Sequence, residues 1–167
     1  MYPNETKRTA ETRKVLTTFL FISLFVCMMA GHAQGADTVN IIAKNPEVLA
    51  KSIYTIEFDI SKEIPPQATI EITFPAEFDL SGVLIGSSTT INGGFKLDVN
   101  ETRIVLKRSG LGRIIGANEK VDVKFANVTN PPESKTDFEL KIEIKNDAGE
   151  SIIQQTDKLS IIAPSEK

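Results

Sequence analysis

Apolar and polar residues alternate with a period of two along most of the chain beyond residue 38. Between Tyr54 and Ile60, every second residue is apolar, and polar or charged residues stand between them. The same period recurs in residues 68–74, 95–99, 102–107, 121–125 and 138–145. Because successive side chains of a β-strand point to opposite faces, each segment is predicted to be a strand with one buried and one solvated face.

Further strands are predicted at residues 39–43, 83–85 and 152–162, which brings the total to seven to nine. Asn100 and Glu101 separate two alternating runs and predict a hairpin. Strands with a single apolar face form antiparallel sheets, and two such sheets pack face to face to keep those faces dry. The sequence therefore predicts an all-β protein, an antiparallel two-sheet sandwich of immunoglobulin-like size that lacks the Cys and Trp of antibody domains.

The beginning of the chain has a different pattern. Residues 15–30 form an uncharged run of 16 residues directly after Arg13 and Lys14, which is typical of a secretory signal peptide. The run is shorter than the roughly 20 residues that a membrane-spanning helix needs. Ala33 and Gly35 fit the small-residue rule for cleavage after Gly35, and Gly31 with Ala33 offers a second site after Ala33.

We therefore expect a hydrophobic, helical signal peptide at residues 1–35 and a single β-sandwich domain at residues 36–167. A retained N-terminal anchor is the alternative, and it would be the only part of the protein to contact a membrane. With either outcome the domain is exported, to the periplasm, the cell surface or the extracellular space.

Composition excludes several classes of function. The chain has 19 Lys and Arg against 22 Asp and Glu, a balance that argues against binding to nucleic acid. The single His, His32, and the single Cys, Cys27, both lie in the predicted signal peptide. The expected domain thus lacks the residues for a Ser-His-Asp or Cys-His nucleophile and for a His-ligated zinc ion. No catalytic residue, metal ligand or cofactor is predicted, and an enzyme relying on carboxylates alone is the least favoured alternative.

One stretch is a candidate binding site. Lys107, Arg108 and Arg113 are the densest group of cations in an otherwise acidic domain; the first two precede the glycines of residues 110–116 and Arg113 lies among them. The glycine spacing does not fit a phosphate-binding fingerprint and predicts a flexible loop between the sheets. If the domain binds an anionic sugar or lipid headgroup, we expect these three side chains to contact it. Phe78 is the one aromatic residue predicted off a strand, so a sugar-stacking surface is disfavoured.

Two segments, residues 64–81 and 123–149, resemble the repeat modules of secreted prokaryotic cell-surface proteins. The resemblance implies an immunoglobulin-like sandwich with a non-enzymatic surface or adhesive role. The leading hypothesis is thus an exported interaction or structural module of the cell envelope, whose partner is a protein or an envelope component. Self-association through a strand edge is one form of that contact. The alternative hypothesis is a module that binds polysaccharide or an anionic surface.

Overall fold

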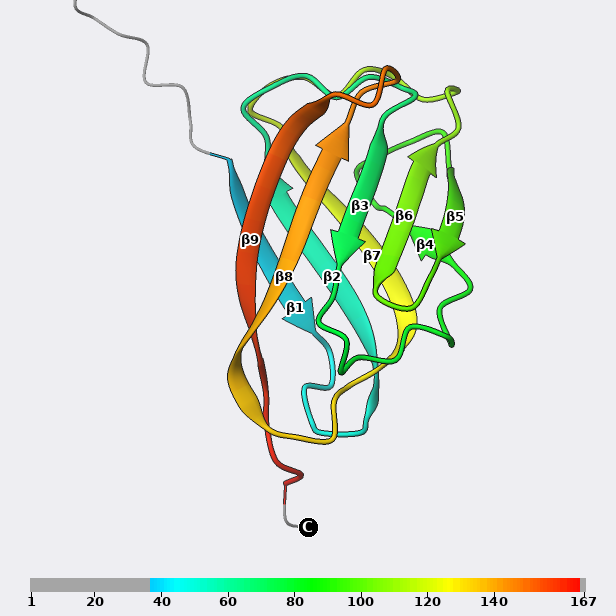
Figure 1. Cartoon of the computed structure of the whole chain (residues 1–167). Coiled ribbons are helices and arrows are strands. Elements are labelled where there is room, and N and C mark those ends of the chain that lie inside the picture. Colours follow the sequence, from blue (N-terminus) through cyan, green and yellow to red (C-terminus); the bar gives the residue numbers. More distant parts are fainter. Residues whose placement is uncertain (1–36, 166–167) are drawn as a thin grey trace, which may run out of the picture. The chain divides into compact units, whose positions relative to one another are not determined.

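The structure of the protein is a computed structural model that describes residues 37–165. These residues contain nine strands in two sheets, joined by loops (Figure 1). The strands are β1 (Thr38–Ala43), β2 (Lys51–Asp59), β3 (Thr69–Thr73), β4 (Gly86–Ser87), β5 (Phe95–Val99), β6 (Arg103–Arg108), β7 (Lys120–Thr129), β8 (Lys135–Lys145) and β9 (Ser151–Ile161). One sheet has the order β1-β2-β7-β4 and the other β5-β6-β3-β8-β9, with every neighbouring pair antiparallel.

This architecture confirms the predicted all-β, two-sheet sandwich and its number of strands. The strand predicted at residues 83–85 is wrong, because β4 begins at Gly86 and is only two residues long. The predicted signal peptide lies outside the described residues, so it remains a prediction, and so does the domain boundary at residue 36.

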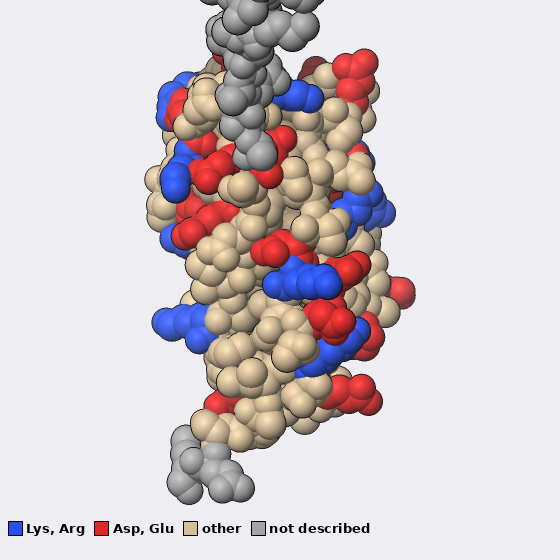
Figure 2. Space-filling view, turned by 90° about the vertical axis from the view of Figure 1, so that its left-hand side faces the viewer, with Lys and Arg blue, Asp and Glu red and all other residues tan. Residues whose placement is uncertain are grey.

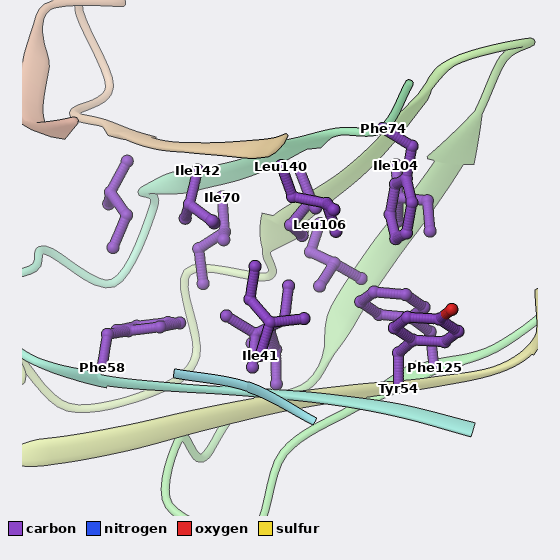
Figure 3. Packing of buried hydrophobic residues seen from close by; sticks show 14 of the residues in the cluster. Ile41, Tyr54, Phe58, Ile70, Phe74, Ile104, Leu106, Phe125, Leu140 and Ile142 are labelled. Atoms are coloured by element: carbon purple, nitrogen blue, oxygen red, sulfur yellow. The ribbon is translucent and has the colours of Figure 1, made fainter. Parts of the chain in front are cut away.

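Side chains from both sheets meet in one continuous core (Figure 3). Ile41, Phe58 and Phe125 come from the four-stranded sheet and face Ile70 and Leu140 of the five-stranded sheet. This core is what the alternating pattern predicts, since apolar residues of one parity face inward on each strand. The Phe78 side chain also belongs to this core and is buried against the rings of Tyr54, Phe74 and Phe138. Phe78 is therefore not an exposed sugar-stacking ring.

A buried hydrogen bond joins the aromatic part of the core to the loops at one end of the sandwich. The Tyr54 hydroxyl donates to Asn130 Oδ1 over 2.6 Å, and both residues are at most 2% exposed. Asn130 Nδ2 donates in turn to the backbone oxygens of Asn45 and Glu47, at 2.9 and 2.7 Å. One amide side chain thus ties the loop between β1 and β2 to the end of β7. Burial raises the pKa of the Tyr54 hydroxyl well above its ordinary value.

The same loop contains a residue in an unfavourable backbone conformation. Leu49 has a φ of 59°. Its side chain is 64% exposed, and its N–H donates to Pro131 O over 3.1 Å. The left-handed region costs about 1–2 kcal/mol for a residue with a Cβ. Backbone hydrogen bonds of Leu49 and of its neighbours Val48 and Ala50, rather than burial of the Leu49 side chain, surround this conformation.

Strand β7 breaks the strict alternation at Asn127, which has a φ of 64°. The register opposite β2 shifts between Ser52 and Tyr54, as in a β-bulge. As a result Phe125 and Val128, three positions apart, both face the core.

Candidate functional site

Arg108, one of the three predicted ligand contacts, lies inside the sandwich. On β6 it shares the inward parity of Ile104 and Leu106, and it is only 2% exposed. Its guanidinium donates to the backbone oxygens of Ile64 (3.1 Å), Pro65 (2.6 Å) and Arg113 (2.7 Å). Burial lowers the pKa of Arg108, with a smaller contribution from the charge of Arg113. Arg108 therefore fastens two loops at one end of the molecule, and an external anion cannot reach its guanidinium.

Arg113 is exposed but already paired. Its two terminal nitrogens donate to the two oxygens of Glu119 over 2.8 and 2.6 Å, a bidentate geometry. Glu119 also accepts from the backbone N–H of Gly116 at 2.8 Å. These hydrogen bonds, first that from Arg113 and then that from Gly116, lower the pKa of Glu119 to about 2. The charge of Arg113 is largely satisfied within its own loop.

The glycine-rich loop is tied down at several points. Gly112 packs against Asn92, and a Cβ at Gly112 would overlap Asn92 O and come within 2.8 Å of Arg108 Nη2. The Arg113 N–H donates to Asn92 Oδ1 over 3.0 Å, and the Ser109 hydroxyl donates to Gly93 O. The loop does connect the two sheets, from β6 to β7, as predicted.

Lys107 lies on the outer face of the five-stranded sheet, directly opposite Lys96 of β5 and Thr69 of β3. The three predicted cations thus occupy three surroundings: Lys107 on a sheet face, Arg108 in the interior and Arg113 in an ion pair. The structure does not bring them together into one site. Anion binding by Lys107 stays a prediction.

Several charges on that outer face form ion pairs, some across strands and some along β8. Glu71 Oε2 of β3 accepts from Lys145 Nζ of β8 over 2.9 Å and lies 3.4 Å from Arg103 Nη1 of β6. Glu143 lies 3.6 Å from Lys145 Nζ and 3.8 Å from Lys141 Nζ. The hydrogen bond to Glu71 is the main cause of the raised pKa of Lys145. This ion network occupies the middle of the five-stranded sheet.

A groove of about 390 Å³ crosses the outer face of the four-stranded sheet. Four of the charged side chains along it form ion pairs within the chain: Lys120 Nζ lies 3.8 Å from Asp59 and Lys124 Nζ 3.2 Å from Asp122. The fifth, Glu57, accepts a hydrogen bond from Asn40 Nδ2 over 3.5 Å. Within residues 37–165, no three or more His, Cys, Asp or Glu side chains gather closely enough to hold a metal ion. The groove therefore offers polar contacts rather than a preformed charged site.

Asp122, on the polar parity of β7, is nevertheless buried, and one of its oxygens collects a set of donors. Oδ1 accepts from the hydroxyls of Ser88, Thr89 and Thr90 at 2.8–3.2 Å and from two backbone N–H groups of the same segment. Burial opposes ionisation of Asp122, but the hydrogen bonds from Thr90 and Thr89 outweigh it and hold the pKa below its usual range. The carboxylate thus anchors the segment that follows β4.

That segment also caps part of one edge of the four-stranded sheet. Strand β4 covers β7 for only two residues, Gly86 and Ser87. Where β4 ends, the Asp122 N–H of β7 donates to the Thr90 hydroxyl over 2.8 Å instead of to a neighbouring strand. A side chain thereby takes the place of a strand along this edge.

The edges formed by β1 and β9 lie next to each other, and each is capped in part by side chains. The Ile41 N–H of β1 donates to Asp157 of β9 over 3.2 Å, and Lys62 Nζ donates to Ile152 O of β9 over 3.3 Å. Beyond β9, Ile162 forms a parallel bridge to Glu47. Figure 2 shows this side of the molecule, where acidic side chains gather with lysines between them. Charges and edge-to-edge contact are common devices against unwanted strand pairing.

Strand β5 is the edge that lacks such a cap. The Asn100 N–H donates to Arg103 O, and the Ser109 N–H donates to Gly94 O. On the β5 side of the hairpin, the backbone groups of the even-numbered residues therefore point toward β6 and bond to it. By the antiparallel alternation, the N–H and C=O groups of Phe95, Leu97 and Val99 point away from β6, toward the open side. Within residues 37–165, no hydrogen bond to these outward groups is found.

Exposed apolar side chains stand beside this open edge. Leu84 and Ile85, just before β4, are 78% and 72% exposed, and β4 lies next to β5 (Figure 1). Gly86 makes the close approach possible, because a Cβ there would overlap Leu106 and lie 3.7 Å from Leu97. The sequence predicts a strand-edge contact in general terms but does not identify β5. The order of strands, which the sequence pattern does not contain, is what exposes it.

Residues 37–165 include no helix with the length and apolar character needed to cross a membrane. No protein-family model matches the chain, and a comparison with curated proteins finds no match.

Solved structures with a similar fold do exist. BcpA, the major pilin subunit of Bacillus cereus, matches with a TM-score of 0.50 and 11% identity, over 77% of this chain and 40% of the pilin. The bacterial hydrophobin BslA matches with a TM-score of 0.47 and 14% identity, over 77% of this chain and 98% of BslA. A non-cellulosomal cohesin from Archaeoglobus fulgidus matches with a TM-score of 0.38 and 15% identity, over 75% and 92% of the two chains. At these identities, the match to the pilin shows a shared β-sandwich fold and no more.

Proposed function

We propose that this protein is an exported, non-enzymatic β-sandwich that works by contact, as an interaction or structural module of the cell envelope or the extracellular space. The observation that carries the proposal is the difference between the sheet edges. The β1, β9 and β4 edges are each capped in part by side-chain hydrogen bonds or lie against each other, whereas no such cap is found among the described residues at β5, beside exposed Leu84 and Ile85. An open edge strand is a template on which another chain can add a strand.

Two further observations support this proposal. The uncharged run at residues 15–30 after Arg13 and Lys14 is typical of export. The fold also occurs in a major pilin subunit, so it is compatible with a role at the cell surface. The proposed partner is a protein or another envelope component rather than nucleic acid, since the chain is acidic overall, with a net charge of −3.

A second candidate function is binding to an anionic polysaccharide or surface, and one observation favours it. Lys96 and Lys107 are directly opposite on neighbouring strands, and neither forms an ion pair among the described residues. Like charges in this position repel each other, and an anion bridging the two would relieve the repulsion. This candidate uses Lys107 of the predicted site but neither Arg108 nor Arg113.

Photo-crosslinking in cells tests the leading proposal. The photoreactive residue p-benzoylphenylalanine replaces Asp98 on β5 of the full chain, in cells that export it, and replaces Glu139 on the outer face of β8 in a matched control. We expect adducts with exported or envelope proteins from position 98 and none from position 139. Equal yields from both positions, or accumulation of the chain in the cytoplasm, would contradict the proposal.

A further inference from the structure

The residues of β5 form a pattern that is complementary to itself. The strand is Phe95-Lys96-Leu97-Asp98-Val99, with apolar residues at the ends and centre and one charge of each sign between them. Reading the strand in the reverse direction exchanges Lys96 with Asp98 and Phe95 with Val99. A second copy aligned antiparallel about Leu97 would therefore place unlike charges opposite each other and apolar residues opposite apolar residues.

We infer that the β5 edge binds the β5 edge of a second copy of this chain, related by a twofold axis through Leu97. This inference rests on the proposed contact function and names its partner. In that register Leu97 pairs with Leu97 of the second copy, and Phe95 pairs with Val99 of the second copy. These are the residues whose N–H and C=O groups point to the open side, so each pair can exchange two hydrogen bonds. A register shifted by one residue would instead oppose groups that already bond to β6.

Charges on the outer face favour the same register. Lys96 would lie directly opposite Asp98 of the second copy, and the twofold axis repeats this pair on the other side. Within the chain, Lys96 lies opposite Lys107, an unfavourable pairing, and Asp98 lies opposite Val105. Neither Lys96 nor Asp98 forms a salt bridge with any described residue. The second copy would thus give each charge the partner that its own chain does not provide.

The inner face gains burial in the same arrangement. Phe95, Leu97 and Val99 pack against the core but are only half-buried, because β4 on the facing sheet is short. Side chains directly opposite in an antiparallel pair lie on the same face, so the second copy would extend this apolar row. The axis stands perpendicular to the sheet, which also brings the two β4 edges, with Leu84 and Ile85, toward each other. Most of the apolar surface beside β5 would then be covered.

Exchange of the two charges tests the register. Lys96→Asp places Asp opposite Asp98 of the second copy, and Asp98→Lys places Lys opposite Lys96, so each single variant opposes like charges twice. The double variant Lys96→Asp/Asp98→Lys restores both unlike pairs with no change in net charge. Lys44→Asp, at an exposed position before β2, matches the charge change of Lys96→Asp away from the edge. All variants are made in the full chain, collected from the exported fraction, and compared for folding by circular dichroism and thermal unfolding.

Sedimentation equilibrium at protein concentrations from about 10 µM to 1 mM measures the association, since a short edge contact belongs with weak interfaces. We expect dimers of the wild type and of Lys44→Asp. Each single variant should dissociate at least about tenfold more readily, and the double variant should return to within about threefold of the wild type. A folded double variant that associates no better than the single variants would overturn the inference, and so would a wild type that stays monomeric at 1 mM.

The two proposals can fail separately. If the wild type is monomeric but position 98 still crosslinks to a different envelope protein, self-pairing is refuted and the contact function stands. If position 98 gives no adduct and the wild type is monomeric, both are refuted.

Discussion

Removal of the Tyr54 hydroxyl should weaken the sandwich through a single buried hydrogen bond. Tyr54→Phe leaves the ring in place but removes the donor to Asn130 Oδ1, which lies 2.6 Å away in a site that is almost without solvent. A buried acceptor left without its donor costs about 1–3 kcal/mol. For a domain of this size, each kcal/mol corresponds to roughly 4 °C in Tm, so we expect Tm to fall by about 4–12 °C.

Asn130→Ala should cost more than Tyr54→Phe. The amide accepts from Tyr54 and donates to two loop carbonyls, so three hydrogen bonds are lost, at about 1 kcal/mol each. Because both substitutions remove the same Tyr54–Asn130 bond, the double variant should be less destabilised than the sum of the two by about 1–2 kcal/mol. Asn40→Ala, at an exposed position on β1, is the matched control and should change stability by less than about 0.5 kcal/mol.

Urea unfolding followed by circular dichroism measures these free energies, with thermal unfolding as the second readout. Strictly additive effects in the double variant would refute the reasoning, because they would show that the two side chains do not interact. A Tyr54→Phe protein as stable as the wild type would refute it as well.

Three further predictions concern stability and pH. Leu49→Gly should stabilise the protein by up to about 1 kcal/mol in urea unfolding, because glycine adopts the left-handed backbone without the strain of a Cβ and the side chain that is lost is mostly exposed. Destabilisation would contradict this. A chain cut at the predicted cleavage site would keep Tyr54 as its only tyrosine, and the raised pKa of Tyr54 predicts no phenolate absorbance at 295 nm at pH 11 while that protein stays folded. Stability should fall as the pH rises above about 10, because the tyrosine of the unfolded chain ionises before that of the folded protein. Phenolate absorbance from the folded protein at pH 10 would contradict this. Since the pKa of Glu119 is lowered to about 2, the loop contact to the Gly116 N–H should be intact above about pH 4.5 and lost as the pH falls through 2. Hydrogen exchange at Gly116 should show this dependence, and Glu119→Gln should abolish it.

The pattern of alternation predicts most of the strands because each sheet has one dry face and one wet face. On β2 from Tyr54 to Phe58, and on β8 from Phe138 to Ile144, every inward position is apolar, and the structure buries those positions. The prediction fails at residues 83–85, where three apolar residues follow each other but only Val83 reaches the core. Leu84 and Ile85 are apolar but lie exposed at the surface beside β5. A single sequence does not distinguish an exposed apolar residue from a buried one.

The candidate site is predicted less well, and Arg108 shows why. Its charge suggests exposure, whereas its position, two residues after Leu106, places it on the inward face of β6. The parity was a usable signal, but the carbonyl groups that receive the guanidinium come from loops distant in sequence. Asp122 is the converse case, since its outward parity is correct and its burial depends on hydroxyls of residues 88–90. Contacts made by loops, not by strands, are what the alternation cannot predict.

The placement of β1 has a mechanical consequence. Thr38 begins β1 at one end of the sandwich, and the chain after β9 leaves at the opposite end (Figure 1). A pulling force applied between those two points would act along the strands, so all the hydrogen bonds between β1 and β2 would share the load in shear. A ladder loaded in this direction resists force far better than one opened bond by bond from its end. Held between two attachment points in the envelope, this small domain would transmit tension along its strands, and the contact from Asp157 to Ile41 would add a second point of resistance to the sliding of β1.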